Sequence, residues 1–78
     1  MVNILNDHIK TFYDFAKQCT DYHFRKEQFH SAFGTVMFAQ LIATSKDEWN
    51  AIEKLWNEEW RPKWDALILE TLSPITIP

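Results

Sequence analysis

The side chains that could bind a metal ion are few, and their spacing matches no metal-binding motif. Suitable donor atoms are present on His8, Cys19, Asp21, His23 and His30. Metal sites are commonly signalled by close pairs such as Cys-x-x-Cys or His-Glu-x-x-His, and the chain contains neither. We therefore predict no metal site. Cys19 is predicted to lie on the apolar side of the first helix, so we expect it to be a small, buried, inert side chain.

Catalytic residues are no better indicated. Glu58 and Glu59 could suggest acid–base chemistry, but adjacent side chains on a helix point about 100° apart. The two carboxylates cannot share a site unless another element closes over them, so we expect solvated surface charge. Gly34 is the only glycine, which excludes a glycine-rich phosphate-binding loop. These observations favour a protein that is not an enzyme and that needs no cofactor.

Four tryptophans follow one another at steps of seven, four and four residues. They are Trp49, Trp56, Trp60 and Trp64. If one helix continues through Pro62, all four lie within roughly 80° of one another. In a domain this small, burial in the core is the favoured interpretation. The alternative is an interface with another copy, a partner or a ligand, because tryptophan is enriched in binding hot spots, and the four are then the candidate partner-binding residues.

The segments that must position these side chains show helical spacing. A first amphipathic helix is predicted over about 4–18 and a second over about 24–43. Residues 28–45 carry no charge, which is typical of a helix covered on most of its circumference, either by other helices of its own chain or across a subunit interface. We expect water to be excluded from Phe33, Met37 and Trp56, and another backbone or ring to approach Gly34. The second helix has a large apolar ridge (Phe29, Phe33, Met37, Leu41) and a small-residue ridge (Ser31, Thr35, Ala39, Ala43).

A third helix begins at a capping box, in which Ser45 accepts from the Glu48 amide and Glu48 reaches back to the cap amide. Pro62 either kinks this helix or begins a fourth one, because proline removes a backbone donor and crowds the preceding turn. Helical spacing continues to Leu72, and residues from about 73 to 78 are predicted to be an extended tail. The fold class is therefore all-α: a single domain over 1–78, built as a three- to four-helix up-and-down bundle, with the last helix kinked or broken at Pro62.

Charge and composition exclude several classes of partner. The formal net charge is −3, from 8 basic and 11 acidic residues of mixed order. Nucleic-acid binding depends on clustered Lys and Arg, so we predict no nucleic-acid partner. The uncharged segment is short and interrupted by polar residues, so we predict no membrane span. The first residues lack a secretion-signal pattern, and we expect a cytoplasmic protein.

The uncharged helix and the tryptophan stripe together offer more apolar surface than one small bundle is expected to hide. The sequence thus favours a non-enzymatic helical interaction module whose partner is another copy, as a homodimer or larger assembly, or a different protein. Two alternatives stay open. One is a small-molecule binder with its ligand among core aromatic side chains. The other is an acidic inhibitor or antitoxin-like protein that covers a basic site.

Overall fold

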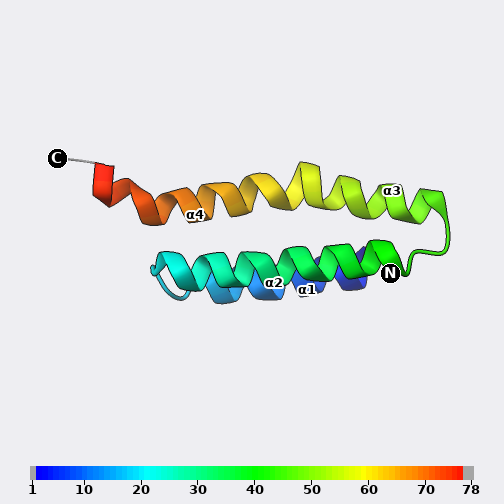
Figure 1. Ribbon diagram of the computed structural model, residues 1–78, viewed down its shortest axis with the longest axis horizontal. Helices are drawn as coiled ribbons and strands as arrows, with labels where there is room; N and C mark the ends of the chain where they lie inside the picture. Colours follow the sequence, from blue (N-terminus) through cyan, green and yellow to red (C-terminus); the bar gives the residue numbers. More distant parts are fainter. Residues whose placement is uncertain (1, 77–78) are drawn as a thin grey trace.

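Three helical segments lie side by side in an up-and-down arrangement (Figure 1). The computed structural model describes the backbone of residues 2–76 and the side chains of residues 2–72. Its elements are α1 (Val2–Ala16), α2 (Tyr22–Leu41), α3 (Lys46–Lys54), the π-helix η1 (Leu55–Trp60) and α4 (Arg61–Thr76). The last three follow one another without a break and form the third segment. The principal extents are 50 × 18 × 16 Å. The predicted all-α bundle is confirmed, and the described residues contain no strand.

Side-chain caps fix where α2 and α3 begin. The Asp21 carboxylate accepts a hydrogen bond of 2.8 Å from the Phe24 amide at the start of α2. The Ser45 hydroxyl accepts one of 3.1 Å from the Glu48 amide, as the capping box predicts. Glu48, however, accepts from the Thr44 amide at 3.1 Å rather than from the amide of the cap residue. The box therefore also holds the residue before the cap, which stiffens the entry into α3.

The core is one cluster formed by the inner faces of all three segments. The side that α2 contributes is narrow, with Ala32, Val36 and Ala39, whereas the third segment contributes three indoles. Small residues on one helix leave room for large rings on its neighbour, which is how close packing is reached here. The buried apolar residues are Leu5, Ile9, Ala16, Ala32, Val36, Ala39, Ile52, Leu55, Trp56, Trp60, Trp64 and Leu67.

The helix α2 faces the core with a different side from the one predicted. Ala32 and Val36 are buried, whereas Phe33, Met37 and Leu41 are 37%, 53% and 82% exposed. The expectation that Phe33 and Met37 are shielded from water was wrong. Residues four apart advance by about 400°, so a row of steps of four winds around the helix by about 40° at each step. Only alternating steps of four and three keep to one side.

Pro62 lies inside the third segment and does not divide it into separate helices. It is the second residue of α4, directly after the π-helix η1. At the end of η1 the Arg61 amide donates to the Trp56 carbonyl, five residues earlier. Proline lacks a donor and crowds the carbonyl four residues before it, and a π-turn is wider than an α-turn. The irregular turn before Pro62 therefore gives its ring room, so that the helix continues.

The helix α4 extends further than predicted. An extended tail was expected from about residue 73, but α4 continues to Thr76. The expected extended conformation is therefore wrong for the backbone of 73–76, where Pro74 lies within the helix. Residues 77 and 78 lie outside the described part of the chain.

Candidate functional site

Three of the four tryptophans of the predicted stripe are core residues. Trp56, Trp60 and Trp64 are 3%, 6% and 0% exposed, whereas Trp49 is 40% exposed at the start of the segment. Trp56 is therefore shielded from water, as expected. A buried ring cannot contact a partner while the bundle is folded, so the stripe is not a continuous binding surface. Of the four candidate partner-binding residues, Trp49 alone offers a substantial accessible area.

Aromatic side chains from α1 and α2 hold the three buried indoles in place. The Tyr13 ring lies 5.4 Å from that of Trp60 and 5.3 Å from that of Trp64, measured between ring centroids. From the other side, the Phe29 ring lies 5.7 Å from Trp56 and 5.9 Å from Trp64. Tilted and edge-on contacts of this kind add to the stabilisation that burial provides. These tryptophans thus join the three segments together.

Trp60 also makes a polar contact between α1 and the third segment. Its Nε1 donates to the Asn6 Oδ1 atom at 2.7 Å, and the Lys63 ammonium lies 4.7 Å from its ring centroid. The Nε1 atoms of Trp56 and Trp64 are buried and have no hydrogen-bond partner among the described atoms. Trp60 therefore fixes the rotation of η1 against α1 more specifically than the other two indoles do.

Arg25 is a buried charged residue that the sequence analysis did not single out. It is 3% exposed and lies on the inner face of α2. Its Nε donates to the carbonyl oxygens of Ala16 at 3.2 Å and Cys19 at 2.8 Å, and its Nη1 donates to that of Leu67 at 2.9 Å. The exposed Glu70 carboxylate is 3.4 Å from Nη1. One guanidinium thus ties the end of α1, the first connection and α4 together, which is a structural role.

The exposed apolar side chains gather on the side of α2 that faces away from the core. At 100° per residue, the side of α2 opposite the buried face holds Gly34, Phe38 and Leu41. One edge of this outward side holds Phe33 and Met37, and the other edge holds Ile42. Phe38, Leu41 and Ile42 are 61%, 82% and 48% exposed, and Ile4 of α1 is 64% exposed beside them. We call this set the α2 patch: Ile4, Phe33, Met37, Phe38, Leu41 and Ile42.

Two grooves flank the α2 patch, one toward α1 and the other toward the third segment. One groove, of about 370 Å³, lies between α1 and α2 and is bordered by Ile4, Phe38 and Ile42, with His8 at its edge. The other, of about 260 Å³, lies between α2 and the third segment and is bordered by Phe33 and Met37. The α2 patch therefore spans α2 from one groove to the other, with mostly apolar side chains.

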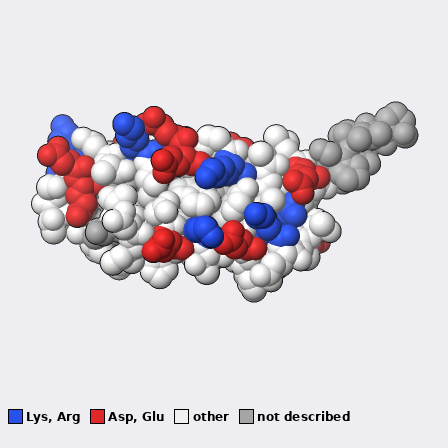
Figure 2. Space-filling view, turned by 180° about the vertical axis from the view of Figure 1, so that it is seen from behind, with Lys and Arg blue, Asp and Glu red and all other residues white. Residues whose placement is uncertain are grey.

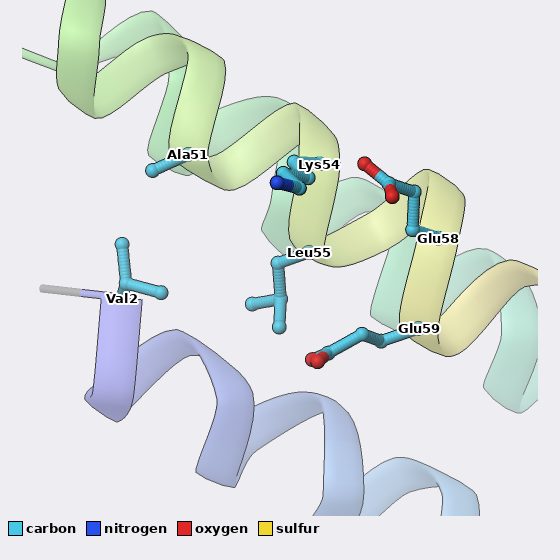
Figure 3. Close-up of a pocket in the computed structure, with 6 residues that line it drawn as sticks. All are labelled: Val2, Ala51, Lys54, Leu55, Glu58 and Glu59. Carbon is cyan, nitrogen blue, oxygen red and sulfur yellow. The ribbon is translucent and has the colours of Figure 1, made fainter.

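A different, more polar groove lies between the start of α1 and the third segment (Figure 3). Leu55 points toward α1 between Val2 and Glu59, while Lys54 and Glu58 lie further out. Both glutamates also border the next groove along α1. The two residues line the same two grooves because α1 lies across from them. Both carboxylates are exposed, with lysines beside them, so they form a mixed-charge surface.

The predicted donor atoms for a metal ion are scattered. His8 borders the apolar groove, His23 stacks edge-on with Tyr22, and His30 does so with Phe29. Cys19 is half-buried in the connection after α1 rather than on that helix, so its predicted place on the helix was wrong. Within residues 2–72, no group of three or more His, Cys, Asp or Glu side chains could hold a metal ion.

Charged side chains of both signs are interspersed over the face shown in Figure 2. The Lys10 ammonium donates to the Asp14 carboxylate at 2.8 Å on the outside of α1. This hydrogen bond lowers the pKa of Asp14 below its ordinary value and raises the pKa of Lys10. Both side chains are exposed, so the pair belongs to the solvated surface.

None of the described helices has the length and apolar character needed to cross a membrane. Comparison of the chain with protein-family models, with curated proteins and with solved structures found no match.

Proposed function

We propose that the protein is a non-enzymatic helical interaction module that binds a second copy of itself through the α2 patch. The observation that carries the proposal is the exposure of large apolar side chains on a helix whose inner face is already satisfied. A cytoplasmic setting is part of the proposal, and the single cysteine, Cys19, is compatible with a reducing compartment.

The area of the α2 patch fits a dimer interface. Its six side chains are between 37% and 82% exposed, and each leaves on the order of 100 Å² in water. Together they offer on the order of 600 Å² of apolar surface, at the upper end of the largest patch on a typical monomer. A standard interface buries about 800 Å² per partner, of which roughly 60% is apolar. The α2 patch can therefore supply the apolar part of such an interface.

The charge pattern favours a second copy over an oppositely charged protein. Residues 28–45 hold no charged side chain, so two copies of this stretch can meet without like charges facing each other. A partner recognised by charge complementarity would need a charged surface here. An isologous contact, in which both copies use the same surface, needs only a surface that is complementary to itself.

Sedimentation equilibrium over a range of concentrations tests this proposal, with Leu41→Glu as the disruptive variant. We expect the wild-type protein to dimerise and Leu41→Glu to be monomeric with unchanged helix content, because a buried unpaired carboxylate is strongly unfavourable. Leu69→Glu is the matched control, since Leu69 is 61% exposed on α4, outside the α2 patch. It should dimerise as the wild type does. A wild-type protein that stays monomeric at high micromolar concentration would overturn the proposal.

A further inference from the structure

We propose that two copies pair antiparallel along α2, so that Leu41 of each copy lies over Gly34 of the other. This inference rests on the proposed self-association and specifies its geometry. It follows from a notch and a projecting side chain on the same face of one helix, taken together with the symmetry of a homodimer.

Gly34 forms the notch. It lies in the middle of α2 with ordinary helical backbone, and a Cβ atom built on it would meet nothing within 4 Å. Glycine destabilises a helix interior relative to alanine, and neither backbone geometry nor packing within the described chain requires it here. The close approach predicted at Gly34 is therefore not made by this chain's own described residues. A side chain from a second copy can make it.

Leu41 is the projecting side chain. At 82% exposure it is the most exposed of the large apolar residues that the structure describes. It follows Gly34 by seven residues, which is nearly two full turns, so the two positions point in directions about 20° apart. Both lie at the middle of the outward face, opposite the buried Ala32 and Val36. A leucine can pack closely over a glycine, because the glycine has no side chain to hold the two helices apart.

Twofold symmetry decides between the two directions of pairing. In an isologous contact, if residue 34 meets residue 41 of the partner, then residue 41 meets residue 34. An antiparallel pair satisfies this with its axis between Met37 and Phe38. The uncharged run 28–45 has its midpoint between residues 36 and 37, so the two runs overlap almost completely. A parallel pair would place leucine on leucine and leave both notches empty.

A size swap tests the register directly. Gly34→Leu fills the notch and Leu41→Gly removes the projecting side chain, and we expect each to raise the dimer dissociation constant at least tenfold. The double variant Gly34→Leu/Leu41→Gly exchanges the two and should return it to within about threefold of wild type. Circular dichroism of diluted monomers checks that each variant is folded.

Gly34→Ala is a second test that cannot fail through loss of folding. Because the position is open, the extra methyl group should raise the melting temperature of the diluted monomer. The same methyl group should raise the dimer dissociation constant severalfold. If the wild type dimerises but the swap does not restore affinity, or Gly34→Ala leaves affinity unchanged, this register is wrong while self-association stands. A monomeric wild type overturns both proposals.

Discussion

Replacing Arg25 with alanine should destabilise the bundle more than any surface substitution. The change removes charged donors from three main-chain carbonyl oxygens, those of Ala16, Cys19 and Leu67, at 2.8 to 3.2 Å. Two N–H groups make these contacts, because the single Nε hydrogen is shared between Ala16 and Cys19. A hydrogen bond from a charged group contributes about 1.5–3 kcal/mol, so the two groups together contribute about 3–6 kcal/mol. The contact with Glu70 adds less than about 1 kcal/mol, because that carboxylate is 67% exposed.

We therefore expect Arg25→Ala to lower the free energy of unfolding by about 3–5 kcal/mol. A chain of this length has about 4–12 kcal/mol in total, so the variant should be partly or wholly unfolded without denaturant. Urea unfolding followed by far-ultraviolet circular dichroism measures the change, at a concentration where the protein is monomeric. With a slope of about 1 kcal/mol per molar urea, the midpoint should fall by several molar or disappear.

Two control variants separate the contributions. Arg25→Met keeps an unbranched side chain of similar length, so its smaller loss reports the hydrogen bonds apart from packing. Glu70→Ala should cost less than about 1 kcal/mol. A loss of less than about 1 kcal/mol in Arg25→Ala, or an equal loss in Glu70→Ala, would refute the view that the main-chain contacts stabilise the bundle.

Two further predictions concern single contacts of α1. Asn6→Ala removes the acceptor of the 2.7 Å hydrogen bond from Trp60 and should lower the free energy of unfolding by about 1 kcal/mol, with a shift of the Trp60 indole N–H resonance. An unshifted resonance would contradict the contact. Because the hydrogen bond from Lys10 lowers the pKa of Asp14, the pair's contribution to stability should be complete above the ordinary carboxyl pKa and be lost as the pH falls through the lowered value. Lys10→Met should return the pKa of Asp14, followed by NMR, toward its ordinary value, and no change would count against the pairing.

Periodicity predicted the helices but not which side of α2 is buried. The inner positions Arg25, Phe29, Ala32, Val36 and Ala39 alternate steps of four and three, and this pattern is legible in the sequence. The prediction failed because the larger side chains of α2, such as Phe33 and Met37, were expected to be the buried ones. The indoles of the third segment occupy much of the interior, and beside them α2 buries the small side chains of Ala32, Val36 and Ala39. Which side of α2 faces the core depends on how the other segments pack, so the sequence of α2 alone does not decide it.

The position of Arg25 in the pattern of buried residues gave a weak indication of its role. A charged residue at a position in step with buried Ala32 and Val36 is unusual and calls for buried acceptors. The sequence does not show that those acceptors are carbonyls at the end of α1 and in α4, since they come together only when the bundle folds. The uncharged stretch of α2 was predicted to be covered either within the bundle or at a subunit interface, and the structure shows that Phe33 and Met37 are not covered within the bundle.

The π-helix η1 is the place in the third segment where the loss of one residue would not change which later side chains face the core. The inward residues Ile52, Trp56, Trp60 and Trp64 are separated by three successive steps of four, one residue more than alternating steps of four and three would allow. The surplus residue is absorbed in η1. Deletion of the exposed Glu58 would remove the surplus residue and keep the later core-facing side chains on the inner face, but it would also remove the wide turn that gives the Pro62 ring room. Deletion of one residue from α4 would rotate all that follows by about 100° and turn Leu67 outward.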